Sequence, residues 1–433
     1  MEYAELYESK KRSVADCLSL IQSRDVIATG TDSNAAVTLL KQLHTIADRV
    51  EGVWVIKGAD RVYPFMTEPG MDGHINTTGL IMGPGNRESQ KLFNYQYTPA
   101  NLHDWIVRWS QYRPVTVLLT AVTPMDEEGN LYMSTCLINE AEALKSKSLR
   151  RIIVQVNRKM PHLKPAAGKI HISQVDALIE ADDDLWSVPS PVPTPKDKLI
   201  GELASEFIHD GDTIQIGLGS TADMVALALE SKCDLGLHTE LFTPGIGNLI
   251  RKGVITGTKK TINRGRHVGT FVIGDPALYE DMDTNPAYML VPGQYANDPF
   301  VIAQNDNMVS INTALEIDLT GQVCSESIGS RMFSGTGGAT DFAYGALHSK
   351  GGRGIIAMSS TAKQGTISKI KPQLTPGSAV TISRNLVDII ITEYGAAYMR
   401  GRTLRERAQN LIAIAHPDFR SELTEQAKSL GLL

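Results

Sequence analysis

The chain has 433 residues, of which 42% are hydrophobic and 21% charged, and its formal net charge is −6 at pH 7. This length exceeds one ordinary hydrophobic core and predicts two domains, or three. The acidic balance argues against a nucleic-acid-binding protein. The four cysteines are far apart and include no C-x-x-C pair, so neither a zinc ribbon nor a disulfide framework is indicated.

The first residues, MEYAELYESKKR, contain acids from the second position and no apolar segment, which is unlike a secretory signal. No stretch approaches the roughly 18 uninterrupted apolar residues that a membrane-spanning helix requires. We therefore expect a cytoplasmic enzyme or binding protein that associates with neither membranes nor nucleic acids.

The chain begins with a pattern of helix, strand, turn and helix that returns later. An amphipathic helix is predicted over residues 12–22, and DVIATGTDSNAAVTLL (25–40) then gives the strand, the turn and the second helix. The same succession starts with a helix over residues 198–208 and continues through DTIQIGLGSTADMVAL (212–227). The two copies align without gaps at a constant offset, which predicts an internal duplication; a chance match between strand–turn–helix units is the alternative.

Between the two copies lies the proline-rich VPSPVPTP, residues 188–195. Prolines at alternate positions favour extended backbone and interrupt helices and central strands. We therefore predict a linker at 188–195 that separates a first domain, residues 1–187, from a second domain, residues 196–433. A proline-rich edge loop inside a single domain is the alternative.

Apolar, β-branched runs alternate with helical patterns along both halves. Runs that are apolar on both faces and separated by helices predict parallel or mixed sheets covered on both sides. The expected fold class is α/β, with two open α/β domains. Ligands of such folds bind beyond the carboxyl ends of the strands, so we expect the active site in the cleft between the domains. The runs are 114–122, 150–156, 269–274, 353–358, 378–383 and 387–392.

A glycine loop follows the strand of the second copy. Gly217, Gly219 and Ala222 have the spacing G-x-G-x-x-A, which seats a dinucleotide pyrophosphate on a helix N-terminus. Glu240 stands about 20 residues later, where such folds carry a ribose-binding acid. A nicotinamide-dependent oxidoreductase is therefore one open interpretation. In the first copy Asp32 replaces the second glycine, and its charge would repel a phosphate, so only the second loop is predicted to bind an anion.

Other catalytic motifs find little support. Ser360-Thr-Ala-Lys363 matches S-x-x-K, but the downstream motifs of serine acyl-enzymes are missing, so Lys363 is interpreted as a candidate phosphate-binding cation, with a solvated surface lysine as the alternative. The ten histidines form no H-x-x-x-H or H-E-x-x-H, and no metal site is predicted.

What remains is one carboxylate and a second glycine loop. Glu240 ends an apolar stretch, and a carboxylate becomes a nucleophile when its target is activated and desolvated. A surface or ion-paired glutamate is the alternative. The loop SGTGGATDF (334–342) supplies backbone N–H groups of the kind that stabilise an oxyanion. Together they predict acyl chemistry.

More specific segments follow one another along the whole chain: PMDEEGN, GLGSTADM, GLHTELFTPG, SINTALEIDLTGQVCSESIG, FSGTGGATDFAYGA, TAKQGTISKI and ITEYGAAYMRGRTLRERAQNLIAIAHPDFR. They resemble the acetyl-CoA hydrolase/transferase family, and most closely its 4-hydroxybutyrate and butyryl-CoA:acetate CoA-transferases. The resemblance implies two NagB/RpiA-like domains and transfer of CoA between a short-chain acyl-CoA and acetate. It also implies a homodimer or higher homo-oligomer, with coenzyme A as substrate and no permanently bound cofactor.

The resemblance further implies roles for individual residues. Glu240 matches the catalytic glutamate of an H-[ST]-E segment, which forms a covalent glutamyl-CoA thioester in a ping-pong reaction. Gly337 and Gly338 match an oxyanion loop. Asn312 and Glu393 match positions expected to orient the reacting groups, with a strand-end amide and a structural ion pair as the alternatives. The expected CoA-binding residues are Gly217, Leu218, Gly219, Ser220, Thr221, Gly337 and Lys363.

Two further alternatives share part of this pattern. An acyl-CoA hydrolase on the same fold would pass the acyl or glutamyl group to water, so the two activities differ in how well the site excludes water. A non-catalytic CoA-binding regulator would leave Glu240 unreactive. The loop GTDSNA and Thr123 depart from the family's pattern on the expected substrate side, so the resemblance does not fix the acid.

Overall fold

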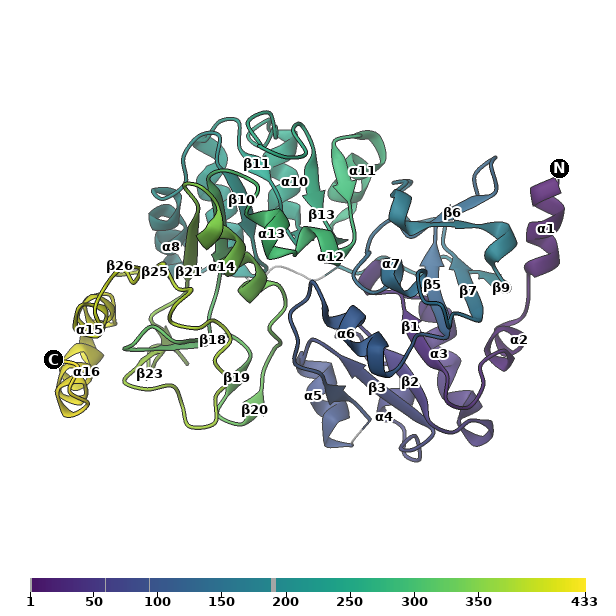
Figure 1. Ribbon diagram of the computed structural model, residues 1–433, viewed down its shortest axis with the longest axis horizontal. Helices are drawn as coiled ribbons and strands as arrows, with labels where there is room; N and C mark the ends of the chain where they lie inside the picture. Colours follow the sequence, from purple (N-terminus) through teal and green to yellow (C-terminus); the bar gives the residue numbers. More distant parts are fainter. Residues whose placement is uncertain (1, 59, 93, 188–191) are drawn as a thin grey trace. The chain divides into compact units, whose positions relative to one another are not determined.

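The computed structural model describes residues 2–58, 60–92, 94–187 and 192–433 (Figure 1). Its chain divides into two compact units. The first comprises Met1–Val188 and Gly269–Tyr295, and the second comprises Pro189–Val268 and Ala296–Leu433. Among the helices of the described residues, none has both the length and the apolar character needed to cross a bilayer.

One segment departs from the predicted division at 187 and 196. Residues 269–295, which the sequence assigned to the second domain, belong to the first unit. The cause is backbone pairing: Phe271 forms a bridge with Cys136, and Val272 donates to the carbonyl of Thr135 at 3.0 Å. Such pairing joins segments that are distant in the chain, and the composition of neither segment predicts it.

The predicted linker lies partly outside the described residues, since 188–191 are not among them. Its end forms the start of helix α8 (Pro195–Ser205). Thr194 caps this helix: its side chain accepts from the backbone of Asp197, whose carboxylate accepts in return, a capping box that fixes where the helix begins.

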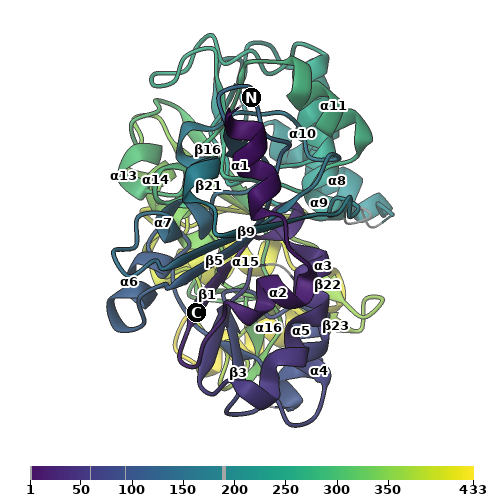
Figure 2. The same ribbon diagram turned by 90° about the vertical axis from the view of Figure 1, so that its right-hand side faces the viewer.

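The first unit is built on a seven-stranded parallel sheet in the order β4-β3-β2-β1-β5-β7-β9. Figure 2 shows β9, β5, β1 and β3 in this succession. The apolar runs predicted at 114–122 and 150–156 form two of the strands. The sheet strands are β1 (Val26–Thr29), β2 (Val53–Ile56), β3 (Ile75–Gly79), β4 (Gln96–Tyr97), β5 (Val117–Val122), β7 (Arg151–Val156) and β9 (Ala177–Glu180).

Helices and small strands complete this unit. The helices are α1 (Glu2–Lys10), α2 (Val14–Ser19), α3 (Val37–Gln42), α4 (Pro64–Thr67), α5 (Pro84–Lys91), α6 (Trp105–Tyr112), α7 (Glu140–Ala143) and α11 (Pro276–Thr284). An antiparallel pair, β6 (Asn130–Tyr132) with β8 (Lys169–His171), lies outside the main sheet. The remaining strands are β14 (Phe271–Val272) and β15 (Tyr288–Leu290), while β13 (His267–Gly269) and α12 (Gly293–Ala296) span the unit boundaries.

The second unit contains a six-stranded sheet in the order β11-β10-β16-β21-β25-β26, parallel except for β26. Its strands are β10 (Thr213–Ile216), β11 (Gly236–Leu237), β16 (Met308–Asn312), β21 (Arg353–Ala357), β25 (Ile389–Thr392) and β26 (Gly395–Tyr398). Because β11, β10 and β16 run in parallel, the loops after them meet at one edge of the sheet, where ligands of open α/β sheets bind.

Helices flank this sheet: α9 (Ser220–Ala228), α10 (Pro244–Arg251), α13 (Pro299–Ile302), α14 (Ala339–His348), α15 (Leu404–Ala413) and α16 (Pro417–Ser429). The last two, yellow in Figure 1, pack on each other, and α15 packs on β26. The remaining short strands include two pairs, β19 (Ser327–Ile328) with β20 (Arg331–Met332) and β22 (Thr361–Ala362) with β23 (Ile367–Ser368). A three-stranded sheet has the order β18 (Val323–Cys324), β17 (Glu316–Asp318) and β24 (Ile370–Lys371). Strand β12 (Leu241–Phe242) follows Glu240.

The prediction of a strand at residues 378–383 is wrong. Only Ile382 forms a bridge, with Val323. The backbone N–H of Ala379 donates to the Ser327 hydroxyl at 2.8 Å, and the Ser378 hydroxyl donates to Glu316 at 2.8 Å. Side chains of neighbouring segments therefore satisfy polar groups that a sheet partner would otherwise bind.

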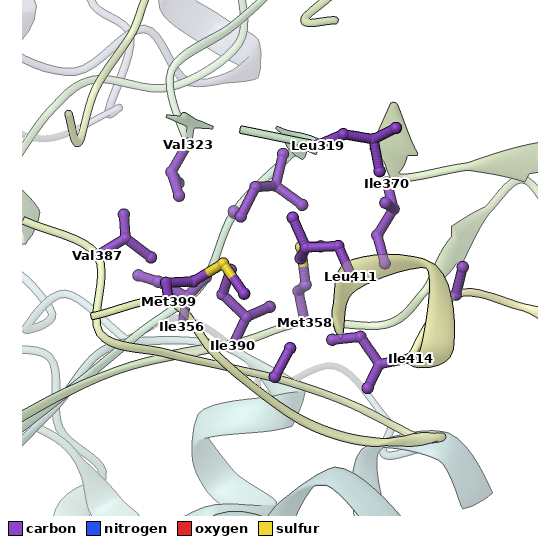
Figure 3. Packing of buried hydrophobic residues seen from close by; sticks show 14 of the residues in the cluster. Leu319, Val323, Ile356, Met358, Ile370, Val387, Ile390, Met399, Leu411 and Ile414 are labelled. Carbon is purple, nitrogen blue, oxygen red and sulfur yellow. The ribbon is translucent and has the colours of Figure 1, made fainter. Parts of the chain in front are cut away.

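A buried apolar cluster holds the second unit's small sheet, main sheet and C-terminal helices together (Figure 3). Figure 3 shows side chains from β21, β25 and α15 converging on those of the β17–β18 region. Removing such side chains from water is the main favourable contribution to folding. The labelled members are Leu319, Val323, Ile356, Met358, Ile370, Val387, Ile390, Met399, Leu411 and Ile414.

The strands matched by the predicted duplication occupy comparable places in the two sheets. β1 lies between β2, the next strand, and β5; β10 lies between β11, the next strand, and β16. A turn and a helix follow each of them. This likeness is what a duplication would produce, and the duplication itself stays a prediction.

Candidate active site

Glu240 lies in the turn that joins β11 to β12, at the carboxyl edge of the second unit's sheet. Its Oε2 atom accepts a hydrogen bond of 2.7 Å from Nδ2 of Asn297. The backbone beside it is fixed as well, because the N–H of Thr239 donates to the carbonyl of Val268 at 3.0 Å. The carboxylate therefore has one defined orientation.

The pKa of Glu240 is raised to about 7, chiefly by burial and also by the nearby charge of Asp341. The hydrogen bond from Asn297 and a backbone hydrogen bond with Gly338 act in the opposite direction, since both stabilise the charged form. A carboxylate with this pKa is ionised in a large fraction of molecules near neutral pH and is more basic than an ordinary glutamate. These are the properties of a nucleophile or a base.

The second glycine loop lies directly against this carboxylate. Gly338 is the N-cap of α14, and Gly337 before it has φ of +52°, a conformation that favours glycine. A Cβ atom on Gly338 would lie 2.0 Å from Oε2 of Glu240 and 2.2 Å from Nδ2 of Asn297. Only glycine leaves room for the carboxylate here. The N-terminal end of α14 also carries partial positive charge, which favours an anion.

The first glycine loop forms the turn from β10 into α9. The N–H of Gly217 donates to the carbonyl of Ile311 at 3.1 Å, and Gly219 caps α9 with φ of 120°. Leu218 between them is 49% exposed. The loop thus presents the backbone N–H groups of a helix N-terminus at the same edge of the sheet as Glu240.

The hydroxyls of Ser220 and Thr221 have a protein partner. Both donate to Oδ1 of Asp197 on α8, at 3.3 Å and 2.7 Å. Asp197 already accepts from Thr194 in the capping box, so one carboxylate ties the start of α8 to the start of α9. The loop's capacity to bind an anion therefore rests on its backbone N–H groups.

Asn312 ends β16 beside this loop. Its side-chain amide exchanges two hydrogen bonds of 3.3 Å with that of Gln215 on the neighbouring strand. A Cβ atom added to Gly217 would lie 4.0 Å from its Oδ1. Among the described residues, Asn312 therefore contacts the first glycine loop, and no hydrogen bond joins it to Glu240.

Glu393 takes part in a separate network. It accepts from the backbone and the hydroxyl of Ser360, at 2.7 Å and 2.8 Å, and forms an ion pair of 3.2 Å with Lys196. These hydrogen bonds lower its pKa, although burial opposes them. Lys196 adjoins Asp197 on α8, so Glu393 is connected to the first glycine loop. The ion pair with Lys196 is the contact that the alternative expects, and the orienting role of Glu393 stays a prediction.

Lys363 lies at the exposed turn between β22 and β23, where Lys363 and Gln364 both have positive φ. In the described part of the chain, no ion pair or hydrogen bond of its ammonium group joins it to the other candidates. Lys369, six positions along the same segment, interacts electrostatically with both Glu393 and Asp197, and burial lowers its pKa to about 8. Its ammonium is the cation closer to the loop network.

Sequence reasoning missed two side chains of the Glu240 site, Asn297 and His238. Asn297 stands in QYANDPF, a segment without a recognised motif, and its Oδ1 atom is buried without a hydrogen-bond partner. His238 belongs to the H-[ST]-E segment, which flagged only the glutamate. The available signal was the spacing of two residues between His238 and Glu240, which places both on one side of an extended segment.

Across the described residues, no three His, Cys, Asp or Glu side chains gather as the ligands of a metal ion would. The site consists of a carboxylate, an amide, two glycine loops and backbone N–H groups. Such a set can attack an activated carbonyl and stabilise the oxyanion that results.

Known proteins resemble this chain over its whole length. The model of the acetyl-CoA hydrolase/transferase C-terminal domain matches residues 274–427. The succinyl-CoA:cyclohexane-1-carboxylate CoA transferase of Geobacter metallireducens is 39% identical, over 99% of this chain and 97% of that protein. The 4-hydroxybutyrate coenzyme A transferase of Clostridium kluyveri is 38% identical, over 99% of both.

The crystal structure of RipA from Yersinia pestis superposes with a TM-score of 0.93, covers 100% of both chains and is 34% identical in sequence. The relatives that match over the full length are CoA transferases, so the oxidoreductase interpretation is not supported. The chain belongs to the acetyl-CoA hydrolase/transferase family and is an acyl-CoA:carboxylate CoA-transferase.

Proposed function

We propose that this enzyme moves CoA between a short-chain acyl-CoA, 4-hydroxybutyryl-CoA or butyryl-CoA, and acetate, through a covalent thioester on Glu240. The observation that carries the proposal is the setting of Glu240: a largely buried carboxylate held by Asn297 at 2.7 Å and lying against Gly338. The identity of the acyl group rests on the resemblance to 4-hydroxybutyrate and butyryl-CoA:acetate CoA-transferases.

The first half-reaction consumes the acyl-CoA. An oxygen of the Glu240 carboxylate attacks the thioester carbonyl, the C–S bond breaks, and CoA leaves as a thiolate. The product on the enzyme is a mixed anhydride between Glu240 and the acyl group. The thiolate then attacks the glutamyl carbonyl carbon, and the bond from this carbon to the bridging oxygen breaks. The acyl group departs with that oxygen as the first carboxylate. Glu240 now carries CoA as a thioester.

The second half-reaction runs these steps in reverse with acetate. Its carboxylate attacks the glutamyl carbonyl and displaces CoA thiolate, which leaves acetyl-glutamyl anhydride. The thiolate attacks the acetyl carbonyl, and Glu240 leaves as a free carboxylate with acetyl-CoA formed. No bond energy of the thioester is lost to water, so the overall exchange needs no nucleotide.

Gly338 and the first turn of α14 are assigned to the oxyanion. Attack on either carbonyl places negative charge on its oxygen, and a backbone N–H aimed at that charge is typically worth about 3–4 kcal/mol of barrier. Asn297 assists by donating to the glutamyl oxygen that is not bonded to the acyl group. We assign the anionic portion of CoA to the backbone N–H groups of residues 218–221, because that of Gly217 already donates to Ile311.

The test is an intact mass spectrum recorded after brief incubation with butyryl-CoA and, separately, with acetyl-CoA. The wild type should gain the mass of CoA, and Glu240→Ala should gain nothing and lose transfer to acetate. Glu230→Ala is the matched control, because this glutamate pairs with Lys252 at 2.6 Å on the surface and should leave both the adduct and the turnover intact.

Turnover by Glu240→Ala would overturn the assignment of the nucleophile. Release of free acid from acyl-CoA at the same rate with and without acetate would identify a hydrolase on this fold. A wild type that binds CoA but neither forms the adduct nor turns over would correspond to a regulator.

A further inference from the structure

His238 lies fully buried two residues before Glu240 and contacts the other segments that build the nucleophile's site. Its Nε2 is 2.9 Å from the carbonyl oxygen of Ala296, the residue before Asn297. Its Nδ1 is 3.3 Å from Nδ2 of Asn305. Its ring meets that of Phe342 on α14 edge to face, with centroids 6.4 Å apart.

The hydrogen-bond partners define the tautomer. The carbonyl of Ala296 can only accept, so Nε2 carries the proton and donates. The amide nitrogen of Asn305 can only donate, so Nδ1 accepts. One neutral imidazole thus satisfies both neighbours, whereas the other tautomer would satisfy neither.

The surroundings keep this ring neutral. Burial lowers the pKa of His238 to about 3, and the charge of Lys260 lowers it as well. Lys260 is itself fully buried and donates to the carbonyls of Leu237 and Arg266 at 2.7 Å and 3.0 Å. Burial lowers the pKa of this lysine to about 7. His238 therefore has the wrong properties for proton transfer near neutral pH and the right ones for a fixed structural donor.

The three contacts have a common consequence. Each contact of His238 lies next to a part of the site in the chain. His238 is two residues before Glu240, and Ala296 directly precedes Asn297. Phe342 lies in the first turn of α14, whose N-cap is Gly338. A displacement of the imidazole therefore changes the position of the carboxylate relative to its amide donor and its glycine loop.

We propose that His238 is a positioning residue, whose Nε2–H bond to Ala296 sets the alignment of Asn297 and α14 with the carboxylate of Glu240. The inference rests on the proposed role of Glu240 as nucleophile. It assigns His238 no contact with substrate and no proton transfer.

Two substitutions separate this role from simple packing. His238→Gln can place an amide N–H where Nε2 lies and still donate to Ala296. His238→Asn is too short to do so, although both remove the ring. His238→Asn should lower kcat by about 10²-fold, as expected for a displacement near 1 Å at a reacting group. The KM for acyl-CoA should change little, and His238→Gln should recover most of kcat.

The pH profile gives a second measurement. The Asn297 hydrogen bond lowers the pKa of Glu240, so losing the alignment should move the acidic limb of kcat/KM to higher pH in His238→Asn. The charged groups facing the pair are Asp341 on α14 and Lys260 behind the imidazole, and neither is altered. Glu316→Gln is the control, since this buried carboxylate accepts from Thr375 and Ser378 elsewhere in the unit. It should lower thermal stability without moving the limb.

Equal kcat and an unshifted limb in His238→Asn would overturn the proposal while Glu240→Ala remains inactive, which distinguishes this failure from a failure of the nucleophile assignment. Equal losses of kcat in His238→Asn and His238→Gln, with no shift of the acidic limb, would also overturn the proposal, because they would show that the ring acts only through packing. If the variants do not fold, ¹⁵N-histidine spectra of the wild type decide. A neutral, Nε2-protonated ring at pH 5 supports the proposal, and a ring that titrates near its ordinary value overturns it.

Discussion

Gly338→Ala isolates the contact between the second glycine loop and Glu240, the proposed nucleophile. Gly338 has φ of −92° and ψ of 5°, a conformation that alanine can adopt, so the backbone itself is not strained. The added Cβ would nevertheless lie 2.0 Å from Oε2 of Glu240 and 2.2 Å from Nδ2 of Asn297. Since non-bonded heavy atoms need about 3.5 Å, one side must move by more than about 1 Å.

That movement breaks either the hydrogen bond of 2.7 Å between Asn297 and Glu240 or the approach of the Gly338 N–H to the carboxylate. A misplacement of about 1 Å at a reacting group costs on the order of 10²-fold in rate. Loss of one oxyanion donor costs about 10²–10³-fold, or about 3–4 kcal/mol of barrier. We therefore expect Gly338→Ala to lower kcat of CoA transfer by at least about 10²-fold.

The assay is acyl-CoA:acetate exchange followed as kcat and KM, together with thermal unfolding. The matched control is Gly354→Ala on β21, whose Cβ would make only ordinary contacts of 3.8 Å and 3.9 Å. This control should keep its activity. Gly338→Ala with a wild-type kcat would refute the geometry, and a loss that merely tracks lowered thermal stability would remove the steric explanation.

Two further predictions concern charge and the first glycine loop. The proposed mechanism requires Glu240 as a carboxylate, and its pKa is raised to about 7, so kcat/KM for acyl-CoA should fall about tenfold per pH unit below pH 7 and be constant above it. Because this pKa is raised on folding, the carboxylate destabilises the folded state above pH 7. The free energy of unfolding of Glu240→Gln should therefore exceed that of the wild type by about 3 kcal/mol at pH 8, a difference that vanishes toward pH 4.5, as denaturant titrations would show. Gly219 has φ of 120°, which alanine rarely adopts, and open space around its Cβ position. Gly219→Ala should therefore shift the loop backbone, raise KM for acyl-CoA and leave kcat nearly unchanged. An unchanged KM would place CoA elsewhere.

The α/β fold class could be predicted from the sequence, because strands buried on both faces read as continuous apolar runs. The runs that became β5, β7, β21 and β25 are of this kind. The assignment of residues 269–295 could not be predicted, since a bridge between Cys136 and Phe271 depends on tertiary pairing. The same holds for residues 378–383. There the Ser327 side chain accepts from the backbone N–H of Ala379, and the Glu316 side chain accepts from the hydroxyl of Ser378.

The candidate site divides in the same way. Glu240 was identifiable, because it lies in a segment with a specific pattern at the end of an apolar stretch. Asn297 was not, since its partner is 57 positions away in the chain and a lone asparagine carries no motif. The binding of CoA by Ser220 and Thr221 stays a prediction that rests on their backbone N–H groups, because their hydroxyls donate to Asp197. A hydroxyl's partner is decided by the nearest carboxylate, which the local sequence does not reveal.

The path of the chain between the two units constrains how this protein can be divided. The chain enters the second unit near residue 189, returns to the first at 269 and enters the second again at 296. Glu240 is encoded before this return and Asn297 after it. A gene split at the proline-rich segment would therefore yield a C-terminal fragment that contains 27 residues of the other unit. Expressed alone, each fragment would lack part of the first unit and would expose the surfaces that this part covers. We therefore expect activity only when both fragments are produced in the same cell.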